Sequence, residues 1–311
     1  MAYNEKISCF EGTDGYEQLI AESLAPYLEG GLFHYHPAVR KLTLQQLRRL
    51  CSQEDGLLLV VERHLAPTVL SMLHDEHLAV VEDATACIVQ LCKHPAGLST
   101  FDAPQVRATI ESCLGAGANV RMRMMELFAR MCAVSVEAFA VCKSLGAQHA
   151  LIQDIQDSSD VLLRMNAIEM LPKLIGNDPD LRIILPLLET FCDEQSDEQS
   201  AFGPSFLAVI AHVISQAWQA GTEVPDQLLS KLHAVLASRL RITSQEEAVV
   251  NSLSVLCQSE HGARLVVSWA DICNSLVALF ESTTKQDVYI VLLLTFNSLL
   301  VHGDRFGTDQ A

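Results

Sequence analysis

The sequence predicts an all-α protein built as a solenoid of helical repeats. Half of the 311 residues are hydrophobic and only 6% are aromatic. An apolar chain that is poor in aromatic residues favours helices packed on helices over β-sheets. In addition, amphipathic segments recur along the chain at a nearly constant spacing. We therefore expect one repeat array over residues 1–311.

The repeat is visible in seven amphipathic segments, each closing on apolar residues. The segments end at residues 51, 92, 132, 175, 214, 257 and 300, which are 41, 40, 43, 39, 43 and 43 residues apart. One such unit cannot bury its own apolar face, so neighbouring units stack to form a continuous core. The spacing predicts about seven repeats, wound into a right-handed superhelix that is a monomer.

Each of these long helices is preceded by shorter ones. The clearest unit runs from Gly56 to Cys92, with a short helix to His64, a second over about 66–73 and a long third helix from Leu78. This triplet resembles the armadillo repeat. Three of the long helices have an arginine at their start, namely Arg40, Arg121 and Arg164. This feature favours the related HEAT repeat, in which such arginines form a structural ladder.

An acidic insert interrupts the array. Between Cys192 and Pro204 the sequence DEQS is written twice, which predicts a loop over 193–203. It is either a functional lip or an inert linker between helices.

Charge and hydropathy exclude several classes of partner. The net charge is −17, which disfavours nucleic acid and anionic membranes and favours a basic partner surface. The longest apolar run, 288–294, is shorter than the ~18 to 20 residues of a spanning helix. No signal peptide is recognised at the N-terminus. We expect a cytoplasmic protein, possibly also nuclear.

The ten cysteines show no C-x-x-C spacing. Four of them close repeats within apolar stretches, which predicts reduced, buried thiols rather than a disulfide framework: Cys51, Cys92, Cys132 and Cys257.

No pattern indicates catalysis. The close histidine pairs are His34 with His36 and His74 with His77, and neither has the further ligands that zinc requires. The Cys92-Lys93-His94 run is expected to close a helix rather than to form an activated thiol. We therefore expect a non-enzymatic protein with no metal and no cofactor.

The third helices are expected to line a groove that binds another protein. Importin-type armadillo proteins carry tryptophan there, whereas Trp218 and Trp269 lie elsewhere. The groove is instead mixed in charge, which fits a folded polar domain, although the acid–base pairs in it are also typical of solvated helix surfaces. The predicted partner-binding residues are Gln45, Arg49, Gln90, Glu126, Arg130, Glu169 and Lys173.

Three segments together resemble one family. They are GGLFHYHPAVRKLTLQQLRRL (30–50), VRMRMMELFARMCAVSVEAF (120–139) and DVLLRMNAIEMLPKLI (160–175). They are similar, in the same order, to the family of 26S proteasome non-ATPase regulatory subunit 5, over roughly residues 15–300. The resemblance implies an elongated helical-repeat chaperone that assembles the base of the proteasome regulatory particle. It also implies that the partner is the C-terminal domain of a proteasomal ATPase ring subunit.

Two alternatives remain: a general armadillo/HEAT adaptor for another protein, and a scaffold subunit of a phosphatase. Members of the resembled family extend further at both ends, so this chain is a fragment, a shortened product or a divergent relative. Its last helix, 287–301, is apolar all round, which predicts an exposed sticky edge.

Overall fold

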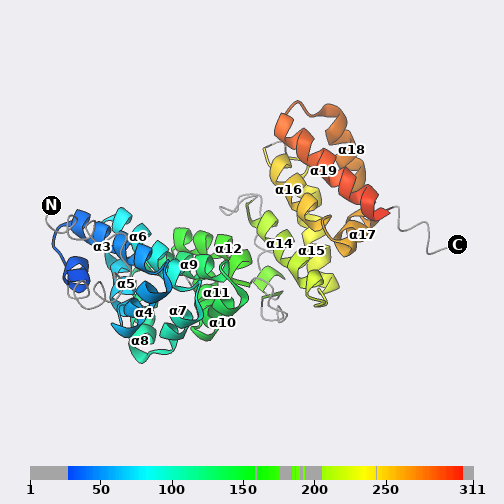
Figure 1. Ribbon diagram of the computed structural model, residues 1–311. Coiled ribbons are helices and arrows are strands. Elements are labelled where there is room, and N and C mark those ends of the chain that lie inside the picture. Colours follow the sequence, from blue (N-terminus) through cyan, green and yellow to red (C-terminus); the bar gives the residue numbers. More distant parts are fainter. Residues whose placement is uncertain are drawn as a thin grey trace. The chain divides into compact units, whose positions relative to one another are not determined.

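The computed structural model describes residues 27–157, 160–175, 184–185, 187–189, 192, 205–242 and 244–303. Within these ranges all regular structure is helical, and the prediction of an all-α helical-repeat fold is confirmed. The chain forms two compact units, Met1–Leu163 and Arg164–Ala311 (Figure 1). Whether the two units form one continuous array, and with which handedness, depends on how they join. The single right-handed array over residues 1–311 therefore stays a prediction. The predicted 193–203 loop lies outside the described residues.

The first unit repeats a short–medium–long pattern of helices. Residues 27–32 are helical, and the helices that follow are α3 (Pro37–Leu50), α4 (Glu54–Glu62), α5 (Ala66–Ser71), η1 (Met72–His74), α6 (Leu78–Leu91), α7 (Pro95–Ser99), η2 (Thr100–Asp102), α8 (Pro104–Leu114), α9 (Ala118–Cys132), α10 (Val136–Ser144), α11 (Ala147–Asp157) and α12 (Val161–Ile175).

The boundary between the units falls within α12. The second unit continues with α14 (Ser205–Gln219), α15 (Asp226–Arg239), α16 (Glu246–Leu256), α17 (Glu260–Ser268), α18 (Ala270–Ser282) and α19 (Gln286–Gly303). Here α17, α18 and α19 repeat the short–medium–long pattern of the first unit.

Local sequence explains where these helices begin. Proline occupies the first turn of α3, α5, α7 and α8, where its missing N–H leaves no hydrogen bond unmade. The Ser135 hydroxyl accepts the N–H of Ala138 at the start of α10, and the Ser259 hydroxyl accepts the N–H of Gly262 at the start of α17. The chain turns sharply between first and second helices, by 82° at α4–α5 and 91° at α17–α18.

The core of each unit lies between successive long helices. In the first unit α3 packs on α6 and α6 on α9, and in the second α14 packs on α16 and α16 on α19. The facing side chains are fully buried, among them Leu44, Leu47, Ile88 and Phe128. The long helices therefore expose one side to solvent and bury the other, as stacked repeats require.

Candidate partner-binding surface

The third helices of the first unit present the surface on which partner binding was predicted. We call it the third-helix surface and define it by Gln45, Arg49, Gln90, Glu126 and Arg130. The amide of Gln45 on α3 donates a hydrogen bond of 3.1 Å to Asp83 on α6. Glu126 and Arg130 form an ion pair one turn apart on α9. Arg49 is exposed and Gln90 half-buried. These side chains are therefore at least partly accessible, and the cross-helix hydrogen bond from Gln45 to Asp83 was not foreseen from the sequence.

The remaining predicted residues, Glu169 and Lys173, lie on α12. Both side chains are exposed, at the i and i+4 positions of the helix. They belong to the second unit, so they are described separately from the third-helix surface of the first unit.

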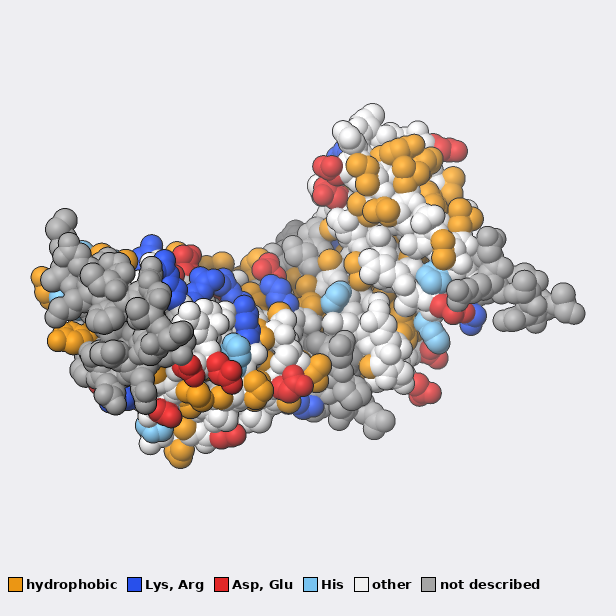
Figure 2. Space-filling view, in the orientation of Figure 1, with side chains coloured by type: hydrophobic (Ala, Val, Ile, Leu, Met, Phe, Trp, Pro, Cys, Tyr) orange, Lys and Arg blue, Asp and Glu red, His pale blue; other side chains and the backbone are white. Residues whose placement is uncertain are grey.

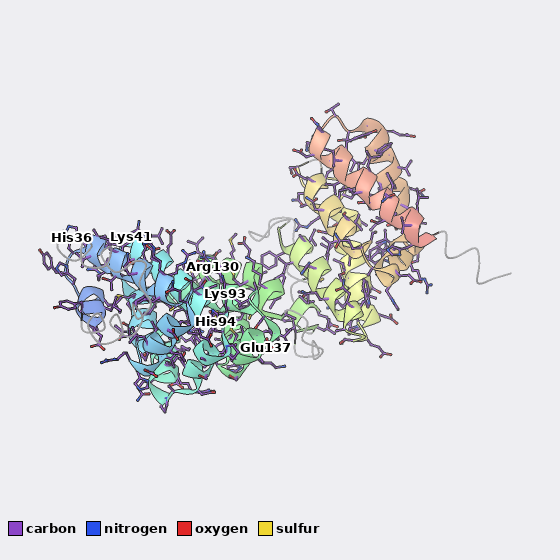
Figure 3. The ribbon with its side chains drawn as sticks, viewed as in Figure 1. His36, Lys41, Lys93, His94, Arg130 and Glu137 are labelled. Carbon is purple, nitrogen blue, oxygen red and sulfur yellow. The ribbon has the colours of Figure 1, made fainter. Side chains whose placement is uncertain are left out.

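Basic residues gather at the C-terminal ends of the long helices in the first unit. Arg48 and Arg49 lie in the last turn of α3, Lys93 follows α6, and Arg130 lies near the end of α9. Figure 2 shows Lys and Arg side chains along this side of the unit, and Figure 3 labels Lys93 and Arg130 from consecutive repeats. Positive charge there complements the helix dipole. Arg49 and Lys93 have no ion-pair partner among the described side chains, so they remain available to an acidic group of a partner.

Arg40 joins neighbouring repeats, as the predicted ladder requires. Its guanidinium donates to both carboxylate oxygens of Asp75, at 2.6 and 3.0 Å, and to the carbonyls of His34 and Tyr35. Burial alone would raise the pKa of Asp75. The hydrogen bonds from Arg40 and from the backbone N–H of His77 outweigh it, so the pKa lies below its ordinary value.

Arg121 makes the corresponding link in a later repeat. Its guanidinium lies 2.5 Å from the carboxylate of Asp154, which is 3% exposed, and donates to the carbonyl of Leu114. Burial raises the pKa of Asp154, against the opposing effect of Arg121. Arg123, which sequence reasoning missed, donates to the carbonyls of Leu73 and Asp75 at 2.7 and 2.9 Å. Arg40, Arg121 and Arg123 therefore each link neighbouring repeats of the first unit.

The histidine pairs have structural roles. The imidazoles of His34 and His36 accept backbone N–H groups two residues on, and His77 lies 3.3 Å from Asp75. In the part of the chain that the structure describes, no three His, Cys, Asp or Glu side chains gather as a metal site would require. Over the same residues, no single helix is long and apolar enough to cross a bilayer; the bent pairs α4–α5 and α17–α18 reach that length only together.

The thiols follow the prediction with one correction. Cys51, Cys92 and Cys257 are buried and free, but Cys132 is only half-buried. Cys132 is the last residue of α9, so its side chain is less covered than those that follow α3, α6 and α16. Burial raises the pKa of Cys92 and of Cys257 to about 12. A hydrogen bond with Cys142 lowers the pKa of Cys132.

Comparisons with known proteins agree with the resemblance drawn from the sequence. A family described as "Proteasome non-ATPase 26S subunit" matches residues 16–183. The chain is 26% identical over 156 residues to 26S proteasome non-ATPase regulatory subunit 5 of Bos taurus and of Homo sapiens. The Mus musculus protein of that name is 25% identical. Each match covers 50% of this chain and 31% of the relative, so the chain spans about a third of the relatives that it matches.

Solved structures resemble the chain in fold. A crystal structure of an engineered protein aligns with a TM-score of 0.51 at 13% identity, covering 94% of this chain and 72% of that one. Computationally designed armadillo repeat proteins align with a TM-score of 0.38 at 14% identity, covering 88% and 98% of the two chains. At such identities the first likeness concerns the fold alone, and the second supports no argument.

Proposed function

This chain belongs to the family of proteasome non-ATPase 26S subunits, and from that premise we propose that it is a non-catalytic chaperone for assembly of the base of the proteasome regulatory particle. Its partner in this proposal is the C-terminal domain of a proteasomal ATPase ring subunit. The observation that carries the proposal is the family match over 16–183, because it spans the helices α3 to α12 that present the third-helix surface. We place this activity in the cytoplasm or the nucleus.

The structure supports a binding role for the third-helix surface through its chemistry. Its exposed groups are charged or amide side chains on stacked helices, and the underlying layer is closely packed aliphatic core. A rigid scaffold that presents polar groups suits a folded partner, because few side chains must be ordered on binding. Arg49 and Lys93 add positive charges that an acidic patch on the partner would neutralise.

Exchanging charges at two i, i+4 positions tests the proposal: the ion pair of Glu126 with Arg130 on α9, and the exposed Glu169 and Lys173 on α12. The variant Glu126→Arg, Arg130→Glu, Glu169→Lys, Lys173→Glu keeps the net charge and the i, i+4 spacing but reverses the charge at each point of contact. We expect the affinity for a purified ATPase C-terminal domain, measured by calorimetry, to fall by about tenfold or more. Helicity measured by circular dichroism should not change.

The control is a matched pair on α17. Glu260 and Arg264 form an i, i+4 ion pair with exposure similar to that of Glu126 and Arg130. Glu260→Arg, Arg264→Glu should leave the affinity unchanged. Unchanged affinity in the fourfold variant would exclude these four side chains, including the Glu126–Arg130 pair of the third-helix surface, from the contact. Recovery of other proteins, such as a phosphatase, in place of ATPase subunits from a cell lysate would favour the adaptor or phosphatase-scaffold alternatives.

A further inference from the structure

The second unit contains a cleft whose residues are separate from those of the third-helix surface. Its volume is about 840 Å³, and the residues that line it come from the end of α14, the connection to α15 and the start of α17. They are Trp218, Gly221, Thr222, Glu223, Val224, Pro225, Asp226 and His261. The wall of this cleft therefore combines a large aromatic surface with two carboxylates.

The turn after α14 places these groups together. The N–H of Thr222 bonds to the carbonyl of Ala217 and that of Gly221 to the carbonyl of Trp218, at 2.9 and 3.0 Å. Gly221 has a φ of +71°, which completes the Schellman motif that ends α14. The chain thereby reverses beside Trp218 and passes through Glu223 into the first residue of α15, Asp226.

The aromatic side of the cleft is held in position. The rings of Trp218 and His261 are stacked, with centroids 6.3 Å apart and planes 27° from parallel. Trp218 is half-buried. It can therefore present a fixed indole surface to a ligand at little further cost in side-chain entropy.

The acidic side of the cleft lacks a counter-charge. Glu223 and Asp226 are exposed, and among the described residues neither has an ion-pair partner. None of the eight lining residues is Lys or Arg. By contrast, the buried Asp75 and Asp154 of the first unit both face an arginine. The cleft thus has negative charge that an incoming cation can neutralise.

We propose that this cleft binds an arginine side chain of a partner polypeptide. A guanidinium can stack on the indole of Trp218 and donate in its own plane to the carboxylates of Glu223 and Asp226. Lysine offers a compact, strongly hydrated charge without a planar face, so it fits this wall less well. The inference concerns α14, α15 and α17, and it does not rest on the ATPase contact proposed for the third helices.

Short peptides test the inference on the full chain. The probe is a fluorescein-labelled peptide, Gly-Arg-Gly-Arg-Gly, and its affinity is measured by fluorescence anisotropy. Replacing each arginine by neutral citrulline, which keeps the planar shape, should weaken binding by about tenfold. Glu223→Gln combined with Asp226→Asn should have a similar effect, and because both side chains are exposed the fold should persist.

A second double variant controls for the net charge of the chain. Glu281→Gln combined with Asp287→Asn removes two exposed carboxylates of the same unit outside the cleft. This pair should change the affinity less than twofold. Equal loss in both double variants, equal binding of the citrulline peptide, or no binding of the arginine peptide would each overturn the inference.

Discussion

Single arginine–carboxylate contacts hold neighbouring repeats of the first unit in register. Arg40 meets Asp75 thirty-five residues later, and Arg121 meets Asp154 after a similar interval. A guanidinium held by two oxygens fixes both distance and orientation. The sequence predicted the arginines as a structural ladder because they open successive helices at one register. Their acidic partners lie at helix ends, where nothing in the local pattern distinguishes them from solvated carboxylates.

Neutralising Asp75 should destabilise the protein measurably. In Asp75→Asn the mostly buried Arg40 loses its counter-ion, and we expect the free energy of unfolding to fall by about 2–3 kcal/mol. The measurement is urea denaturation at pH 7. Asp102→Asn is the control, because its ion pair with Arg107 is exposed, and it should cost less than about 0.5 kcal/mol. Equal effects of the two substitutions would contradict this account.

The same contact should make stability depend on pH. The folded-state pKa of Asp75 lies below its ordinary value of 3.8. Its contribution is therefore complete above that ordinary value and is lost as pH falls through the lower, folded-state pKa. The difference in unfolding free energy between wild type and Asp75→Asn should shrink as pH falls below about 4. A difference that is constant from pH 7 to pH 2 would exclude this ionisation as its source.

Thiol reactivity should distinguish the four repeat-closing cysteines. Cys132 is half-buried and its pKa is lowered by the hydrogen bond with Cys142, whereas burial raises the pKa of Cys92 and Cys257. Because the thiolate is the reactive form, we expect Cys132 to be alkylated at least about tenfold faster than Cys92 in the native protein. Peptide mapping by mass spectrometry after brief labelling measures this. Equal rates would refute it.

At the scale of elements, glycines set how closely one repeat approaches the next. A Cβ built on Gly56, Gly97 or Gly262 would lie 2.5, 2.0 or 1.9 Å from the carbonyl oxygen of Leu50, Leu91 or Leu256, the last residue of the preceding long helix. Real Cβ atoms do not approach an oxygen so closely. These glycines therefore allow the first helix of a repeat to pack on the end of the helix before it. The sequence pattern does not reveal their role, because they stand within helices, where glycine carries no turn signal.

Adding one methyl group at Gly97 should consequently destabilise the array. Since backbone must shift to admit it, we expect Gly97→Ala to lower the free energy of unfolding by about 1–3 kcal/mol. Gly117→Ala is a suitable comparison, because no atom lies within 4 Å of the added Cβ and its backbone is extended. Its effect should stay within about 0.5 kcal/mol. A Gly97→Ala protein as stable as wild type would show that the close approach is not required.

The ends of the long helices were largely predictable from the sequence. The repeat spacing predicts ends at 51, 92, 132, 175 and 257, and α3, α6, α9, α12 and α16 end within one residue of them. The prediction was wrong for α14, which continues from 214 to Gln219, and for α19, which continues from 300 to Gly303. Trp218 lies on the extension of α14, and that helix stops only at the turn formed by Gly221. Apolar periodicity therefore locates a helix, whereas its end depends on local backbone geometry.

The side-chain contacts of the proposed binding surface were less predictable than the fold. Periodicity identified the side of the helices that carries Gln45 and Arg130, because solvent-facing positions follow from the buried ones. Which of those side chains pair with each other depends on distances between helices. The cleft at Trp218 was missed for the same reason, since His261 reaches it from a helix more than forty residues away.

At the scale of the whole molecule, charge is unevenly distributed along the chain. Residues 27–175 carry 13 of the 21 basic residues and 16 of the 38 acidic ones, so this segment is nearly balanced. The excess of acid lies in other parts of the sequence, including the DEQS repeat. The net charge of −17 therefore does not describe the third-helix surface, where Arg49 is exposed, or its surroundings, where Lys93 is exposed. A basic partner and an acidic partner can bind different parts of the same protein.

The last prediction concerns an apolar strip on α19. Its members are Tyr289, Ile290, Leu293, Leu294, Leu300 and Val301, which are 41–67% exposed. The other side of α19 packs on α16, α17 and α18. At the edge of the strip, Tyr289 stacks on Phe280 of α18, with ring centroids 4.8 Å apart. Figure 2 shows hydrophobic side chains gathered on the second unit, where Figure 1 places α18 and α19. No described segment covers the strip.

Such a strip should bind hydrophobic dyes and promote association at high protein concentration. Replacing Ile290 and Leu294, one turn apart, by glutamine should lower the emission of a bound naphthalene-sulfonate dye and reduce the apparent mass in concentrated solution. Leu78→Gln with Val136→Gln is the control, because those side chains are even more exposed, at 62% and 77%, but lie on two different helices of the first unit. It should leave both signals unchanged. A wild-type protein that stays monomeric when concentrated and binds no dye would show that the strip is not adhesive.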